Sequence, residues 1–230
     1  MAKIKLIIGI GNPDQEYQNT RHNVGFMFLD YLAKTRDPEQ QQAVYGAGKG
    51  PRTTASCIRG RQETRDKIIW EFDKKSNSLI TKVRIETAPT QKGRGSDRSV
   101  GVILAKPQTY VNKSGEAVKK LATSYKLQAT SLIVVQDDLD IPFGNTKMSF
   151  DKNSGGHKGV ESIMRSLKTK KFHRLRIGIA AKSLQKARQQ SEKKRDEFVV
   201  DYVLSGFSKS ESEKLKEVFK EVYQKLTQLL

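Results

Sequence analysis

The chain has 230 residues, of which 36% are hydrophobic and 30% charged, and its formal net charge is +18. This length is enough for one domain with an ample core, and every apolar run is too short to cross a membrane. A single cysteine, Cys57, excludes an internal disulfide, and with three histidines it leaves too few ligands for a structural zinc site. We therefore expect no metal, cofactor or membrane partner, and a location in the cytoplasm or an organelle matrix.

Short apolar runs alternate with segments of helical periodicity along the chain. This predicts an α/β fold: a single domain over residues 1–230, with a central mixed, mostly parallel sheet flanked by helices. The expected strands, in chain order, are 5–10, 67–72, 79–87, 100–107, 131–138 and 175–180. The expected helices are 23–35, 114–127, 155–169 and 208–230. The last of these begins with a capping box formed by Ser208 and Glu211.

Two polar segments interrupt this alternation. Residues 36–65 are rich in Gln, Gly and Arg, and we expect an irregular connection there. Residues 88–99, "APTQKGRGSDRS", show no apolar periodicity, which indicates a flexible basic insertion.

The loop after the first predicted strand, within "IGIGNPDQEYQNTRHNVGF" (8–26), resembles a phosphate-binding loop at first sight. A dinucleotide fingerprint needs a third glycine at the start of a helix, where this chain has Asp14. An acid there would repel a pyrophosphate, so the phosphate-loop interpretation is poor. Asn12 instead offers an amide that can donate and accept, at the carboxyl end of a strand where α/β clefts form.

His22 follows this loop, just ahead of the first predicted helix. A lone histidine is more often a hydrogen-bonded structural residue than a catalyst, and a base needs a partner at one ring nitrogen. Asp137 and Asp138 end the strand "SLIVV", and in a parallel sheet that end lies near the end of "KLIIGI". These carboxylates could equally cap a helix or join an ion pair. Because no serine or cysteine occupies a nucleophile elbow, a His–carboxylate pair would activate water directly, which favours hydrolysis.

Basic residues gather between Arg165 and Arg195, where twelve Lys and Arg accompany one acid, Glu192. A solvated face is the simple explanation of most charge runs, but such faces usually mix the two signs. The imbalance favours a polyanion, and nucleic acid above all. An acidic membrane surface is a weaker alternative, because no strongly apolar face accompanies these charges.

Separate stretches of the chain together resemble the bacterial-type peptidyl-tRNA hydrolases. They are "GIGNPDQEYQNTRHNVGF", "KPQTYVNKSGEAV", "VVQDDLDIPFG…SGGHKGVESI", "FHRLRIGIA" and "DYVLSGFS". These stretches occur in the family's order and span nearly the whole chain apart from 36–100. The resemblance implies a single α/β domain that cleaves the ester between a peptide and the tRNA 3′ end, recycling tRNA in translation. It also implies a monomer without a cofactor.

The resemblance also implies roles for individual residues. His22 falls on the family's catalytic base and Asp137 on the carboxylate that orients it. The remaining site residues implied are Asn12, Tyr17, Asn112 and Lys158 for the peptide part of the substrate, and Lys147 and Arg176 for tRNA phosphate.

Three positions depart from the family pattern. Lys158 stands where the family has an asparagine, and a cation can donate a hydrogen bond but cannot accept one. Val111 replaces a methionine in the wall of the cleft, and Ser149 replaces a phosphate-binding lysine. Losing a positioning group commonly costs on the order of a hundredfold in rate. The leading hypothesis is a peptidyl-tRNA hydrolase of a divergent branch. Lys158 is explained either by slower hydrolysis, by a change of function to binding, or by neutral change on a tolerant loop.

Two alternatives stay open at this stage. One is a catalytically weakened or inactive RNA-binding relative, for which plant relatives that assist intron splicing set the precedent. The other is a component that acts only when docked on the ribosome. The intact pair of His22 and Asp137 argues against a pure binding protein, which has no evident need for both.

Overall fold

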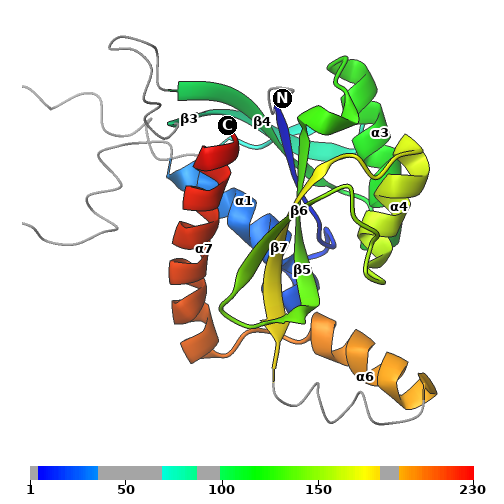
Figure 1. Cartoon of the computed structure of the whole chain (residues 1–230), viewed down its shortest axis with the longest axis vertical. Helices are drawn as coiled ribbons and strands as arrows, with labels where there is room; N and C mark the ends of the chain where they lie inside the picture. Colours follow the sequence, from blue (N-terminus) through cyan, green and yellow to red (C-terminus); the bar gives the residue numbers. More distant parts are fainter. Residues whose placement is uncertain (1–4, 36–68, 87–98, 182–191) are drawn as a thin grey trace, which may run out of the picture.

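The computed structural model describes residues 5–35, 69–86, 99–181 and 192–230 (Figure 1). The predicted connection at 36–65 and residues 88–98 of the insertion predicted at 88–99 lie outside these residues, and Ser99 is instead the first residue of β4. The strands are β1 (Leu6–Gly9), β2 (Glu71–Asp73), β3 (Ser78–Glu86), β4 (Ser99–Pro107), β5 (Leu132–Pro142), β6 (Thr146–Phe150) and β7 (His173–Ala180). The helices are α1 (Val24–Lys34), α3 (Ser114–Ser124), α4 (Lys158–Leu167), α6 (Glu192–Leu204) and α7 (Lys209–Leu229).

The strands form one seven-stranded sheet in the order β2-β3-β4-β1-β5-β7-β6. The central strands β4, β1, β5 and β7 pair in parallel, whereas β2, β3 and β6 pair antiparallel with their neighbours. Parallel neighbours need long crossover connections, and antiparallel strands can be joined by short turns. The predicted mixed sheet is confirmed, with its parallel pairing confined to the centre.

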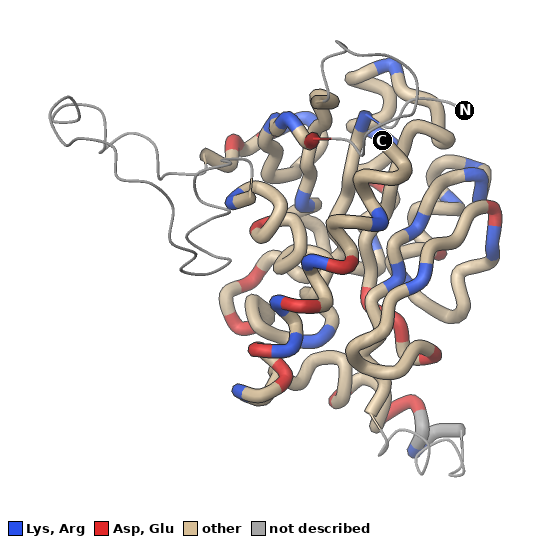
Figure 2. Tube along the Cα trace, turned by 60° about the vertical axis from the view of Figure 1, so that its left-hand side comes forward, with Lys and Arg blue, Asp and Glu red and all other residues tan. Residues whose placement is uncertain are grey.

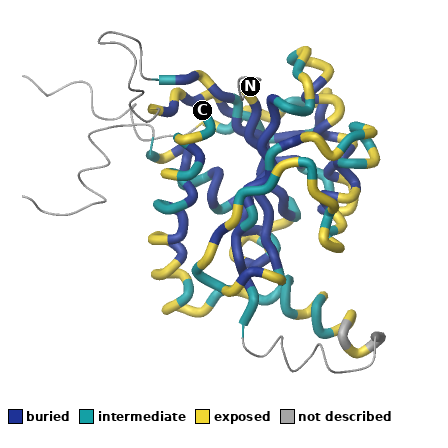
Figure 3. The backbone as a smooth tube through the Cα atoms, in the orientation of Figure 1, coloured by how far each residue is buried: buried dark blue, intermediate teal, exposed yellow. Residues whose placement is uncertain are grey.

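Helices cover both faces of the sheet, α1 and α7 on one and α3 and α4 on the other (Figure 1). Side chains alternate between the faces along each strand. In β1, Ile7 packs with the cluster that contains Phe28 of α1, while Leu6 and Ile8 pack with the cluster that contains Val118 of α3. Because the central strands are buried on both faces, they need continuous apolar runs (Figure 3).

Helix α1 approaches the sheet unusually closely at Gly25. A Cβ atom there would lie 2.6 Å from the carbonyl oxygens of both Ile10 and Val135. Only glycine permits this contact, which brings the start of α1 directly onto the end of β1 and the middle of β5. The residues just before Gly25 are thereby held at the carboxyl edge of the sheet.

The structure also differs from the sequence-based expectations at three elements. The described part of the strand expected at 67–72 gives only the short edge strand β2 at 71–73, with Phe72 exposed. Strand β6 and helix α6 were not predicted, because the sequence of β6, TKMSF, contains no apolar run and α6 has little amphipathic character. The capping box of Ser208 and Glu211 is confirmed at the start of α7.

No helix among the described residues has the length and apolar character needed to span a membrane.

Candidate active site

A cavity of about 1020 Å³ opens at the carboxyl edge of β1 and β5. Asn12 and His22 line it from the β1 side, and Asp137 and Asp138 line it from within β5, just before the pairing of β5 with β7 shifts register. The remaining walls come from the loop before α4, the segment around Asn112 and the apolar residues of α6. The strand ends predicted to meet therefore border one cavity.

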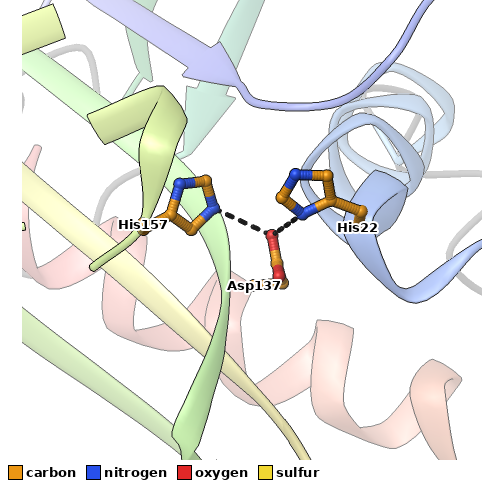
Figure 4. Close-up of side chains that lie close together, drawn as sticks. All are labelled: His22, Asp137 and His157. Atoms are coloured by element: carbon orange, nitrogen blue, oxygen red, sulfur yellow. Dashed lines mark hydrogen bonds and ion pairs between the residues drawn. The ribbon is translucent and has the colours of Figure 1, made fainter. Parts of the chain in front are cut away.

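His22 and Asp137 are in direct contact at the floor of this cavity (Figure 4). The 3-10 turn η2 (Arg21–Asn23) presents His22, and its Nδ1 lies 2.9 Å from Asp137 Oδ1. Asp137 is only 2% exposed. Its carboxylate accepts the Nδ1 proton, so Nε2 of His22 carries the lone pair, and in Figure 4 Nε2 points away from Asp137. This is the tautomer that a general base requires.

A second histidine, His157, shares the same carboxylate oxygen. Its Nε2 lies 2.9 Å from Asp137 Oδ1. His157 is also the N-cap of α4, where its Nδ1 accepts from the backbone N–H groups of Gly159 and Val160 at 3.2 and 3.4 Å. Because Nδ1 acts as an acceptor, the ring proton belongs on Nε2, which donates to Asp137. The helix cap thus determines the tautomer of His157.

This arrangement shifts two pKa values. Burial alone would raise the pKa of the Asp137 carboxyl, but His22 and His157 outweigh burial and hold that pKa well below its usual range. Burial alone would likewise lower the pKa of His22. The charge of Asp137 and its hydrogen bond prevail, so the pKa of His22 is raised above 6.5.

The three side chains also form a group that could hold a metal ion, with one ligand atom from each lying within 4.8 Å of the others. A metal on Nε2 of His157 would need the lone pair of that nitrogen, so Nδ1 would have to carry the proton. Protonated Nδ1 could no longer cap α4. The observed cap therefore fits a hydrogen-bonded triad better than a metal centre.

Asn12 is fixed from two directions. Its side-chain Oδ1 accepts from Val111 N at 3.1 Å. Its backbone N donates to Asn23 Oδ1 at 2.8 Å, and its backbone O accepts from Asn23 Nδ2 at 2.9 Å. With Oδ1 engaged, the amide of Asn12 has Nδ2 to offer to a bound molecule. Asn23 ties this loop to the turn that carries His22.

The other residues expected to bind the peptide part lie in different places. Asn112, in the 3-10 turn η3 (Val111–Lys113), and Lys158, the first residue of α4, are exposed and line the cavity. Val111 lines it too and is buried. Tyr17 does not line it, and ends the 3-10 turn η1 (Gln15–Tyr17) outside the cavity.

The two residues expected to bind tRNA phosphate are cross-strand neighbours at the sheet edge. Lys147 of β6 pairs in register with Arg176 of β7. Lys147 is exposed, whereas Arg176 donates from Nε to Asp138 Oδ2 at 2.6 Å. Ser149 lies two residues along β6, opposite Arg174. Neither Lys147 nor Arg176 lines the cavity, but Asp138 does, so Arg176 adjoins the wall of the cavity.

Sequence reasoning missed three residues of this site: His157, Asp138 as the partner of Arg176, and Asn23. The helix expected at 155–169 begins only at Lys158, so His157, which the prediction placed inside the helix, is its N-cap instead. Nothing in the sequence indicates that its other nitrogen reaches Asp137, twenty residues earlier in the chain.

Known proteins share this sequence and fold. Residues 6–230 match the family model described as peptidyl-tRNA hydrolase. The peptidyl-tRNA hydrolase of Aquifex aeolicus (strain VF5) is 39% identical over 217 residues, which cover 94% of this chain and 85% of that one. That of Sulfurihydrogenibium sp. (strain YO3AOP1) is 36% identical over 208 residues, covering 90% and 81%. The crystal structure of peptidyl-tRNA hydrolase from Acinetobacter baumannii superposes with a TM-score of 0.67 at 25% identity, covering 100% of this chain and 89% of that one.

Proposed function

This chain belongs to the peptidyl-tRNA hydrolase family, and from that premise we propose that His22 is its general base and Asp137 the residue that orients it. Its function is hydrolysis of the ester between a peptide and tRNA, and a non-enzymatic RNA-binding relative is not favoured. The roles of the residues rest on one observation above all. The Nδ1 of His22 lies 2.9 Å from the buried, ionised Asp137, so its Nε2 faces the cavity as a base.

The proposed reaction uses water as the nucleophile. Nε2 of His22 takes a proton from a water molecule while the oxygen of that water attacks the ester carbonyl. Asp137 stabilises the imidazolium that forms. The tetrahedral intermediate then collapses, the bond to the ribose oxygen breaks, and the imidazolium returns its proton to that oxygen. The products are a peptide carboxylic acid and a tRNA with a free 3′ end.

Two asparagines are proposed to grip the substrate. Asn12 donates from Nδ2 toward the ester or the adjacent peptide carbonyl, since its Oδ1 is held by Val111 N. Asn112 faces the same cavity from η3. Amides of this kind pair with peptide backbone regardless of side-chain sequence, which suits a substrate whose peptide varies. For Tyr17, which lies outside the cavity, the geometry offers no comparable support.

We also propose that Lys158 makes this hydrolase slower than one with asparagine at the same position. The lysine is exposed at the cavity wall and lies directly after His157. Its ammonium donates hydrogen bonds but cannot accept one from the attacking water. Lys158→Asn is expected to raise kcat about tenfold or more. An unchanged kcat would mean that this position tolerates either residue.

Binding of tRNA is proposed along the edge formed by β6 and β7. Lys147 and Arg176 are neighbours there, and Lys168, Lys170 and Lys171 lie between α4 and β7. Lys and Arg occur on many elements, mixed with acids on several helices (Figure 2). Lys147→Ala should weaken tRNA binding and flatten its dependence on salt concentration.

We further propose that residues 1–230 form one domain, with a basic insertion near 88–99, and that it acts as a monomer in the cytoplasm or an organelle matrix. The cavity supports a monomer, because one chain supplies residues to all its walls. Sedimentation of the full chain alone and with ribosomes tests both the monomer and the ribosome-bound alternative.

The decisive experiment compares three proteins on N-acetylated aminoacyl-tRNA. The wild type should release the blocked amino acid, and His22→Ala should lose about a hundredfold to ten-thousandfold in kcat. His173→Gln is the matched control, because this histidine lies on β7 with its ring against Phe150. A wild-type rate no higher than that of His22→Ala would reject the proposed mechanism.

A further inference from the structure

Arg21, the residue before His22, is a buried cation that the proposed mechanism does not use. Arg21 is 8% exposed. Its Nη1 and Nη2 donate to the two carboxylate oxygens of Glu211, each at 3.0 Å. Its Nε donates to Ser205 Oγ at 3.2 Å, and its Cζ lies 4.8 and 4.9 Å from the ring centroids of Tyr202 and Phe207. Every hydrogen bond that this guanidinium makes to a described residue therefore goes to the C-terminal segment.

The backbone beside Arg21 makes the same connection. Arg21 N donates to Ser205 O at 3.0 Å, and Thr20 forms an isolated β-bridge with Gly206. These contacts join the turn that carries His22 to the link between α6 and α7. Residues 21 and 211 are 190 positions apart in the chain, so the side chain of Arg21 adds a long-range contact to the backbone hydrogen bonds between these two segments.

The segment held by Arg21 forms one wall of the cavity. Val199, Val200, Val203 and Leu204 of α6 line it opposite the polar floor. Tyr202, whose ring lies beside Arg21, also donates from its hydroxyl to Ile179 O of β7 at 2.6 Å. The guanidinium of Arg21 thus links the turn that carries His22 to Tyr202 of α6, the helix that lines the cavity.

We propose that Arg21 is a positioning residue: it sets the turn of His22 and the apolar wall of α6 at a fixed separation. This inference rests on the proposed function of the cavity. A planar, bidentate guanidinium suits the task because it fixes angle as well as distance, which a single ammonium cannot do. Glu211 serves both this contact and the capping box of α7, where its Oε2 accepts from Ser208 N at 2.8 Å. The N-terminus of α7 therefore belongs to the same set of contacts.

Conservative variants test this without deleting a buried charge. Arg21→Lys keeps the positive charge but loses the bidentate contact with Glu211. Glu211→Gln keeps an acceptor for the helix cap but removes the negative charge that pairs with Arg21. Glu221→Gln is the matched control, because Glu221 lies on the same helix and pairs with Lys225 and Thr146, far along the chain from the site. The measurements are kcat and KM on N-acetylated aminoacyl-tRNA and backbone hydrogen exchange of residues 199–204, all well below the Tm of each variant.

Arg21→Lys and Glu211→Gln should each lower kcat about tenfold to a hundredfold, with a smaller change in KM, and should speed exchange in α6. The double variant should lose little more than either single one. The control should match wild type in both measurements. A lowered Tm alone, with wild-type kcat or wild-type exchange, would reduce Arg21 to a stabilising residue and overturn the proposal. If wild type itself shows no hydrolysis, the proposed function fails, and the exchange measurement alone decides whether Arg21 holds α6.

Discussion

His22 and His157 approach the same oxygen of Asp137 from two sides, and both lie 2.9 Å from it (Figure 4). Their second ring nitrogens differ. In His157 that nitrogen accepts two backbone N–H groups at the start of α4, whereas in His22, which lines the cavity, it points away from Asp137. Two histidines with the same carboxylate partner can therefore have different roles, one as a base and one as a structural donor. The surroundings of the second ring nitrogen determine the role.

This difference separates the two halves of the site. The segment between β1 and α1 contributes His22, a base whose lone pair is available to water. The segment around α4 contributes His157, a hydrogen-bond donor whose tautomer is fixed by the helix cap. Its Nε2 proton is engaged by Asp137 and is not available for catalysis. Asp137 connects them, since a carboxylate with two donors on one oxygen stays ionised and immobile. Changes at Asp137, His22 and His157 should differ accordingly.

The largest effect should come from removing the shared charge. Asp137→Asn leaves a side chain of the same shape, but its amide can present a donor to His22, which favours the wrong tautomer and no longer stabilises the imidazolium. We expect a loss of about a hundredfold to ten-thousandfold in kcat on N-acetylated aminoacyl-tRNA. Glu161→Gln, an exposed charge on α4, is the control and should keep wild-type activity. A loss below tenfold would mean that Asp137 does not orient the base.

The pairing of His22 with Asp137 was predictable because it depends on a general rule. The carboxyl ends of parallel strands meet at one edge of a sheet, so a histidine after the first strand and an aspartate at the end of the strand expected at 131–138 were predicted to lie together. Strand β5 in fact continues to Pro142, beyond the two aspartates. The capping box of α7 was predictable for a similar reason, since it depends on four consecutive residues. Local sequence rules and sheet topology were thus sufficient to predict the contact between His22 and Asp137.

The contacts that fix this floor were not predictable. Arg21 reaches Glu211, and His157 reaches back to Asp137, only because of how α7 and α4 pack on the sheet. Helix α6, which walls the cavity, has too little amphipathic pattern to be recognised, since one of its faces lines a cavity instead of a core. Side-chain pairs of this kind follow from tertiary packing, which one sequence does not reveal.

The next effect is on pH dependence. His22 must be neutral to accept a proton, and its pKa is raised above 6.5 because Asp137 outweighs burial. Activity should therefore rise with pH through a midpoint above 6.5 and fall about tenfold per unit below it. In Asp137→Asn only burial remains, and burial lowers the pKa, so the residual activity should show a midpoint at lower pH. Profiles of kcat/KM against pH for both proteins measure this, and a midpoint that moves upward would contradict the assignment.

The smallest effects should separate the two tasks of His157. Asparagine is a good N-cap and too short to reach Asp137, so His157→Asn should keep the stability of α4 and lose the donor. His157→Ala loses both, at a cost of about 1 kcal/mol for the cap, or roughly 2–4 °C in Tm for a chain of this size. Both variants should lower kcat by about tenfold, because Asp137 keeps His22 as its partner but loses its second anchor. Thermal melts should then distinguish the variants while their kinetics agree. A fully active His157→Asn, with kcat reduced only in the less stable His157→Ala, would contradict this. His157 would then act only as the N-cap of α4, and its bond to Asp137 would not contribute to holding the carboxylate.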